Sequence, residues 1–140
     1  MIVLDTNVLS AMMRVDVDPL VVAWFDGQAP DSIWTTTVTV FEVCFGLELL
    51  PSSRRRRQLE EAFARSLKDD LEGRVLPFDD EAARAAAGHA AARQKAGKSI
   101  EFRDLQIAGI VSSRRATLAT RNTRHFLDLG IELVDPWRRD

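Results

Sequence analysis

Cysteine, histidine and long hydrophobic runs are scarce in this sequence of 140 residues. It contains one cysteine, Cys44, and two histidines, His89 and His125. A single cysteine excludes an internal disulfide and fits a reducing compartment. Together with two histidines far apart in the sequence, it also argues against a zinc site. We expect Cys44 to be a small buried hydrophobic residue.

The hydrophobic runs are too short to cross a membrane. The N-terminal run has no basic segment before it and is too short for a secretory signal peptide. We therefore expect a cytoplasmic protein with no membrane partner. The length suits one domain, residues 1–140, with a substantial core.

The net charge of −2 excludes a generally basic nucleic-acid-binding surface. Arginine outnumbers lysine by sixteen to three. Arginine suits bidentate phosphate contacts, but a biased codon usage gives the same excess. The block Arg54–Arg57 wraps around the start of a predicted helix. A solvated helix start is the favoured interpretation of this block, and a contact with RNA or an acidic partner is the alternative.

Short hydrophobic runs alternate with segments of helical periodicity. Strands are predicted near Ile2–Leu4, Ile33–Thr36, Arg74–Phe78, Thr117–Thr120 and Ile131–Val134. Helices are predicted over Pro19–Gly27, Val38–Leu50, Ser53–Leu71, Asp79–Gly97, Glu101–Arg115 and Thr123–Leu129. Strands separated by helices predict an α/β fold, with a mainly parallel sheet of about five strands covered by helices on both faces.

Asp5 ends the first predicted strand, and Thr6 and Asn7 follow it at the start of a helix. Ligands of open α/β sheets bind at the carboxyl ends of the strands. Asp5 is therefore a candidate functional residue, and the alternative is that it only caps the helix.

Asp104 shares a helical face with Ile107, Ala108 and Val111. A carboxylate on an apolar face is costly unless it is paired or bound to a cation. A site is the favoured interpretation, and an ion pair with a buried arginine is the alternative. Glu101, one turn earlier, either joins the site or lies at its mouth.

Glu42 lies among apolar residues of the helix predicted over Val38–Leu50, which we expect to be largely buried. The glycine one turn later, Gly46, weakens a helix unless a close approach requires it. A solvent-facing stripe shared with Glu48 is a competing interpretation of Glu42. Three carboxylates without a neighbouring lysine suggest a divalent cation, and hard oxygen ligands suit Mg²⁺ or Mn²⁺. Acidic clusters of this kind catalyse phosphodiester hydrolysis.

Four motifs and a closing tripeptide then form a recognisable order. They are Leu4-Asp5-Thr6-Asn7-Val8-Leu9, Thr39-Val40-Phe41-Glu42-Val43-Cys44-Phe45-Gly46, Asp104-Leu105-Gln106-Ile107-Ala108, Leu118-Ala119-Thr120-Arg121-Asn122 and Asp135-Pro136-Trp137. Over the whole chain this pattern resembles PIN-domain ribonucleases, in particular the VapC/FitB-like toxins of bacterial toxin–antitoxin (plasmid-stability) systems.

The resemblance implies a five-stranded parallel sheet and an acidic pocket that binds Mg²⁺ or Mn²⁺ and cleaves RNA. Its first three acidic positions match Asp5, Glu42 and Asp104, which it makes catalytic and metal-binding. Its fourth position is often Asp but is Asn122 here, and one turn later stands His125. Asn122 is a candidate catalytic residue without charge, so the number of metal ions stays open between one and two.

The resemblance also implies a cognate antitoxin, whose amphipathic helix docks in a groove, and a homodimer. We expect Arg121 and Arg124, which flank Asn122, to contact RNA phosphates. Trp24 and Phe25 are expected in the core or in a dimer contact. The predicted function is a metal-dependent endoribonuclease, the toxin of a type II toxin–antitoxin pair.

Two alternatives remain at this point. A metal-dependent phosphatase of the haloacid dehalogenase type also begins with an Asp at a strand end. That chemistry needs a second Asp two residues later, where this chain has Asn7. The other alternative is a catalytically weak module that binds RNA or an antitoxin, because Asn122 replaces an acid.

Overall fold

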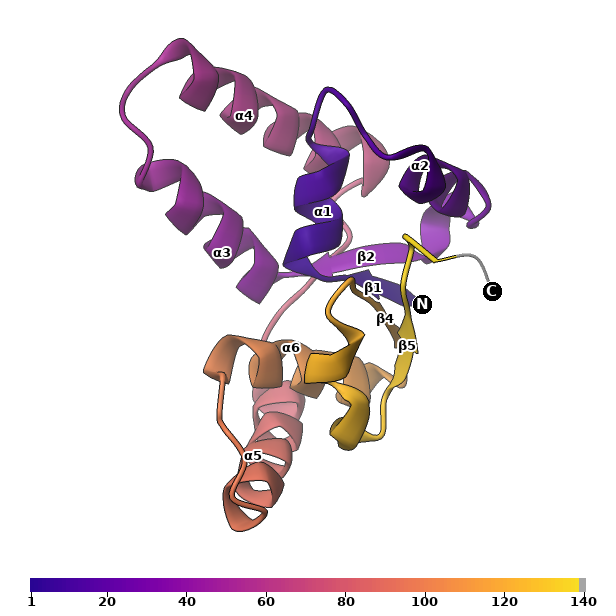
Figure 1. The fold of residues 1–140 in the computed structure, drawn as a ribbon, viewed down its shortest axis with the longest axis vertical. Helices are drawn as coiled ribbons and strands as arrows, with labels where there is room; N and C mark the ends of the chain where they lie inside the picture. Colours follow the sequence, from indigo (N-terminus) through magenta and orange to yellow (C-terminus); the bar gives the residue numbers. More distant parts are fainter. Residues whose placement is uncertain (139–140) are drawn as a thin grey trace.

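A five-stranded sheet forms the centre of the protein, and the computed structural model describes residues 1–138 (Figure 1). All pairs of neighbouring strands are parallel. The strands, in the spatial order β3-β2-β1-β4-β5, are β1 (Ile2–Leu4), β2 (Ile33–Thr36), β3 (Val75–Leu76), β4 (Thr117–Ala119) and β5 (Glu132–Val134). The order reverses between β1 and β4, and such a reversal is where α/β sheets bind ligands.

Helices cover both faces of this sheet, as the sequence predicts. They are α1 (Thr6–Met12), α2 (Pro19–Asp26), α3 (Thr37–Glu48), α4 (Arg54–Arg65), α5 (Asp80–Lys95) and α6 (Phe102–Arg114). Short turns η1 (Pro30–Ser32), η2 (Ser66–Asp70), η3 (Thr123–His125) and η4 (Leu127–Leu129) complete the chain. Of the helices within residues 1–138, none has both the length and the apolar character needed to cross a membrane.

Alternate residues of the strands enter two separate cores. Val3 of β1 and Leu118 of β4 pack with α5 and α6, whereas Leu4 and Ala119 pack with α1 and the end of α4. Figure 1 shows α5 and α6 on one side of the sheet and α1 to α4 on the other. Burial on both faces explains why β1 and β4 are hydrophobic without alternation.

Three predicted elements are shorter or differently wound than expected. The strand predicted over Arg74–Phe78 is only Val75–Leu76, because Pro77 has no N–H for a further ladder bond. The helix predicted over Ser53–Leu71 changes to a π-helical turn at Ser66. The helix predicted over Thr123–Leu129 is two 3₁₀ turns, which are separated by the fully buried Phe126.

Helix α3 is less buried than predicted, and this corrects two expectations. Its inner face carries Val43 and Leu47, while Phe41 and Phe45 are exposed. Cys44 is exposed as well, so the prediction of a buried cysteine is wrong. Gly46 has open space where a side chain would begin, so no close approach explains it.

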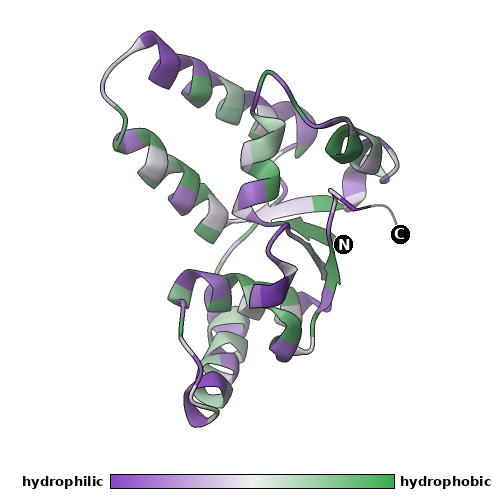
Figure 2. Cartoon of the chain, in the orientation of Figure 1, coloured by the Kyte–Doolittle hydropathy of each residue, from purple (hydrophilic) through white to green (hydrophobic). Residues whose placement is uncertain are grey.

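The arginine block at the start of α4 lies away from the sheet, at the hydrophilic end of this helix (Figure 2). Within it, Arg56 forms ion pairs with Glu48 and Glu60. Its guanidinium also donates to the Leu50 carbonyl oxygen at 3.2 Å. Arg56 thus stabilises the connection between α3 and α4, which agrees with a structural role for this position.

Candidate active site

Asp5 lies at the carboxyl end of β1, beside β4. Its side chain is buried, with 5% of the residue exposed. One carboxylate oxygen accepts the Thr6 N–H at 2.8 Å and thereby caps α1. The other accepts the Thr120 hydroxyl at 2.7 Å and the Asn7 amide at 3.4 Å. Asp5 is therefore both a cap and a buried acid.

Burial raises the pKa of Asp5 above its ordinary value. The hydrogen bonds from Thr120 and Thr6 oppose this rise, because they stabilise the charged form. The charge of Asp104 raises the pKa further, and that of His125 lowers it. The charge of Asp104 thus disfavours the ionisation of Asp5.

Asp104 is in the first turn of α6, on the face that carries the buried residues Ile107, Ala108 and Val111. Its side chain is 23% exposed, and one oxygen lies 3.5 Å from Nδ1 of His125. Burial is the main cause of its raised pKa, which His125 opposes and the charges of Glu101 and Glu42 increase. The partner of Asp104 is an imidazole, so the alternative of an ion pair with a buried arginine is wrong.

Glu42 points from α3 toward the same place. It accepts the Thr6 hydroxyl at 2.9 Å, and its other oxygen lies 3.9 Å from the Arg103 guanidinium. The side chain is only 22% exposed, so the interpretation of Glu42 as part of a solvent-facing stripe is wrong. Thr6 donates its N–H to Asp5 and its hydroxyl to Glu42, and joins the two acids.

Glu101 caps α6 and lies at the edge of the acidic cluster. Its carboxylate accepts the Arg103 N–H at 3.3 Å. Glu101 lines a hollow of about 550 Å³ together with Asp104, Arg124 and His125. Glu101 therefore lies at the mouth of the site, and Arg124 lies within the same hollow.

Asn122 follows β4, as predicted, but its side chain is exposed. Its N–H donates to the Thr120 hydroxyl at 3.1 Å. Arg121 donates its N–H to the Asn7 amide oxygen at 3.1 Å. The guanidinium of Arg121 lies 4.8 Å from the ring centre of Trp137. Asn122 thus contacts the site through its backbone.

His125 is held in place by the turn that follows β4. The buried Arg93 of α5 donates to the His125 carbonyl oxygen and to Asp128 at 3.0 and 3.2 Å. This pairing lowers the pKa of Asp128 to about 2. The position one turn after Asn122 is therefore a histidine whose main chain is anchored by Arg93, where an acid would add charge to the cluster.

The sequence alone predicted no role for Thr120, Thr39 or Arg103. Thr120 supplies the short hydrogen bond to Asp5. Thr39 lies one helical turn before Glu42, and its hydroxyl is 3.2 Å from that of Thr6. The spacing of Thr39 and Glu42 on one helical face is a signal that could have identified Thr39.

The donor set fits a hard divalent cation in its chemistry. Asp5, Asp104 and Glu42 offer oxygen ligands in a largely buried cluster. Burial is the main cause of the raised pKa values of Asp5 and Asp104, and the charges of neighbouring acids raise both further. Within residues 1–138, no three Asp, Glu, His or Cys side chains close into a ligand set in this conformation. The cluster is therefore an open one, with Arg103 and His125 at its rim.

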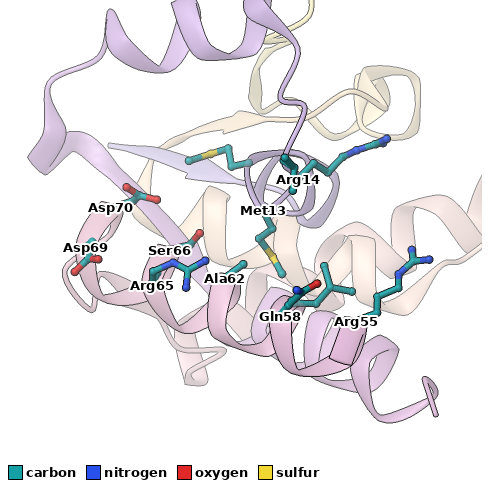
Figure 3. A pocket seen from close by; sticks show the side chains of 12 residues that line it. Met13, Arg14, Arg55, Gln58, Ala62, Arg65, Ser66, Asp69 and Asp70 are labelled. Carbon is teal, nitrogen blue, oxygen red and sulfur yellow. The ribbon is translucent and has the colours of Figure 1, made fainter. Parts of the chain in front are cut away.

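A separate hollow of about 720 Å³ lies between the end of α1 and α4. Figure 3 shows Met13, Gln58 and Ala62 along it, with Asp69 and Asp70 at one end. Asp5, Glu42 and Asp104 are not among the residues that line it. Volume alone therefore does not identify the acidic site.

The comparison with known proteins agrees with this arrangement. The model of the PIN domain family matches residues 2–131. The VapC ribonuclease Y4jK of Sinorhizobium fredii is 36% identical, over 98% of this chain and 98% of its own. The toxin FitB of Neisseria gonorrhoeae is 33% identical, over 98% of this chain and 99% of its own.

The fold comparison gives the same answer. The crystal structure of FitAcB from Neisseria gonorrhoeae matches with a TM-score of 0.89 and 32% identity, over 99% of this chain and 100% of that one. Together, the sequence and fold matches show that this chain belongs to the PIN-domain family and is similar to its VapC and FitB members.

Proposed function

We propose that this protein is a divalent-metal-dependent endoribonuclease and the toxin of a type II toxin–antitoxin pair. The observation that carries the proposal is the buried Asp5 beside Asp104, both with raised pKa values. Such like charges are costly in a fold and are typical of functional sites. The name of the VapC ribonuclease, a relative over nearly the whole chain, supports RNA as the substrate.

Asp5 and Asp104 are the proposed ligands of Mg²⁺ or Mn²⁺, with Glu42 beside them. When bound, the ion polarises a phosphoryl oxygen and lowers the pKa of the attacking water. Thr120 and Thr6 hold the Asp5 carboxylate in one orientation through the hydrogen bonds at 2.7 and 2.8 Å. Orientation of a ligand before substrate binding reduces the reorganisation needed in the reaction.

Arg121 and Arg124 follow β4 on either side of Asn122, and we propose that they hold RNA phosphates. Arg124 lines the same hollow as Asp104. The main-chain N–H of Arg121 donates to Asn7, whose side chain donates to Asp5. Asn122 is proposed to orient water or substrate through its amide. These arginines supply local positive charge at a protein whose net charge is −2.

The experiment is cleavage of a short RNA blocked at both ends, with Mg²⁺ or Mn²⁺ and with EDTA. The wild-type protein should cut internal bonds only with the metal, and Asp5→Ala should be inactive. Hydrolysis of p-nitrophenyl phosphate without RNA cleavage would indicate the phosphatase instead. RNA binding without turnover would indicate the binding module.

A cognate antitoxin and a second copy of this chain are the proposed partners. The gonococcal relative is named a toxin, and the matching crystal structure is of FitAcB. On this chain, Phe41 and Phe45 leave exposed apolar surface on α3, whereas Trp24 and Phe25 pack against the core. The dimer contact is therefore expected on α3.

A further inference from the structure

A cleft beside the acidic cluster carries a second set of residues suited to a nucleic acid. It lies between α1 and the segment that ends at Trp137. Two adjoining hollows form it, of about 230 and 520 Å³, and Ala11, Arg14, Arg121 and Trp137 line both. The larger volume lies in the range of sites that hold a small ligand.

Hydrogen bonds connect this cleft to the acidic cluster. The Asn7 side chain donates to Asp5 at 3.4 Å and accepts the Arg121 N–H at 3.1 Å. Asn7 and Ser10 line the smaller hollow. From Asn7, Ser10 and Ala11 follow at the spacing of one helical face, and Arg14 lies two residues beyond the end of α1. The cleft therefore leads away from Asp5 along α1.

The aromatic floor of the cleft is anchored. Trp137 packs against the core that contains Leu4 and Leu9. The main-chain N–H of Trp137 donates to the Asp135 carboxylate at 2.9 Å, which fixes this closing turn. The guanidinium of Arg121 lies over the ring at 4.8 Å. Guanidinium planes and aromatic rings are the surfaces on which proteins stack unpaired RNA bases.

The charges of the cleft also suit a phosphate. Arg14 pairs with Asp16 at 3.5 Å, but both side chains are mostly exposed, at 69% and 82%. Exposed pairs of this kind contribute little and exchange readily with another anion. Asp16 and Asp18 line only the larger hollow. A phosphate is therefore favoured at the inner end, near Arg121.

We infer that this cleft binds the nucleotide next to the scissile bond of a single-stranded RNA, with its base on the Arg121–Trp137 pair and its phosphate between Arg14 and Arg121. The inference rests on the proposed ribonuclease function and adds to it a substrate subsite. It also gives a role to the closing Asp135-Pro136-Trp137 segment, which holds the aromatic floor.

The test measures binding of a fluorescein-labelled RNA of about nine nucleotides in EDTA, by anisotropy, to the full chain and to Arg14→Ala, Arg121→Gln and Trp137→Phe. Losing a phosphate contact in either arginine variant should weaken binding about tenfold, or 1.4 kcal/mol. Trp137→Phe keeps a smaller ring for stacking, so it should weaken binding less. For the two arginine variants, the slope of log K against log salt should fall by about 0.7 per lost phosphate contact.

Arg84→Ala is the matched control, because Arg84 is an exposed arginine of α5, with 80% of its side chain exposed. It should bind RNA as the wild type does. RNA should also quench tryptophan emission in the wild type and do so less in Trp137→Phe. The subsite would be overturned if both arginine variants bound RNA with the affinity and salt slope of the wild type. It would also be overturned if the wild type showed no detectable RNA binding.

Cleavage kinetics with Mn²⁺ separate this inference from the proposed function. Arg14→Ala should raise KM and leave kcat near the wild-type value, because Arg14 contacts only flanking RNA. An unchanged KM in an active enzyme would refute the subsite alone. RNA binding that depends on Arg14 and Arg121, without metal-dependent cleavage, would refute the nuclease alone.

Discussion

Thr6 donates hydrogen bonds to two different acids and so holds both carboxylates in place. Its N–H reaches Asp5 and its hydroxyl reaches Glu42. Neutral donors stabilise each charge without cancelling it. Asp104 receives less help, because its partner His125 is a 58% exposed imidazole. Asp104 should therefore carry an unrelieved cost at neutral pH.

Asp104→Asn should be as stable as the wild type or more stable at pH 7 in EDTA. The pKa of Asp104 is raised in the folded state, so the folded protein binds the proton more tightly than the unfolded chain does. Wild-type stability therefore falls as pH rises from the ordinary pKa to the raised one. The advantage of Asp104→Asn should shrink as pH falls through that window.

Thermal unfolding across pH checks this expectation, with Glu61→Gln on the exposed side of α4 as the control for the same change. A loss on the order of 3 kcal/mol in Asp104→Asn would contradict it. Such a loss is typical of a broken buried ion pair, and would mean that the pairing with His125 is structural.

Asn122→Asp should not raise the rate of RNA cleavage. The Asn122 N–H bonds to Thr120, which itself donates to Asp5. A carboxylate there would add like charge near Asp5, whose pKa the charge of Asp104 already raises. Asp5, Glu42 and Asp104 supply enough charge for one divalent ion, so we expect little change or a loss.

The measurement is turnover of a short fluorescent RNA at low and high Mn²⁺, with Gln94→Glu on α5 as a control for one added charge. A clear gain in Asn122→Asp, greatest at high Mn²⁺, would show that two ions are required, as in many nucleases.

At the scale of elements, local patterns predicted the helices and strands, and long-range contacts decided the exceptions. The cap residues Asp5, Ser53 and Asp79 lie where their helices begin. The exposed face of α3 could not be predicted, because apolar residues lie on every side of this helix. Phe41 and Phe45 are exposed because only the face of α3 with Val43 and Leu47 packs into the core.

The acids of the candidate site could be predicted from the sequence, but the residues that hold them in place could not. Motif order predicted Asp5, Glu42 and Asp104 as candidate site residues. The Thr120 bond to Asp5, in contrast, depends on the pairing of β1 with β4, more than a hundred residues apart. The tether of His125 likewise depends on Arg93, from a different helix. Contacts of this kind follow from tertiary register and leave no local signal.

Gly109→Ala should destabilise the packing of α5 on α6. A Cβ at Gly109 would overlap the Ala82 carbonyl oxygen and lie 2.7 Å from Ala86 Cβ. Backbone cannot move aside cheaply, so overpacking should cost about 1–3 kcal/mol, despite the better helix propensity of alanine. Urea unfolding measures the loss, and Gly88→Ala, where the Cβ meets open space, should be neutral or stabilising. Equal effects of the two substitutions would contradict the close approach.

At the scale of the whole molecule, the two layers of helices have different roles. Helices α5 and α6 pack tightly and carry Asp104, while α3 and α4 project from the other face (Figure 1). The outer side of α3 presents Phe41, Phe45 and Leu49, which are 56%, 50% and 71% exposed. Contiguous exposed apolar surface of this kind marks an interaction site.

We expect the protein to be a homodimer through this side of α3, because a two-fold interface buries the same apolar patch on both copies. The Phe41 and Phe45 rings lie 5.9 Å apart, and burying one phenylalanine contributes about 1.5–3 kcal/mol. Phe41→Ser/Phe45→Ser should therefore sediment as a monomer at micromolar concentration, with an unchanged circular dichroism spectrum. Leu127→Ser, at an equally exposed position of η4, should leave the dimer intact. A wild-type protein that stays monomeric would refute the dimer and leave the α3 face to an antitoxin, whereas a dimeric double variant would place the interface elsewhere.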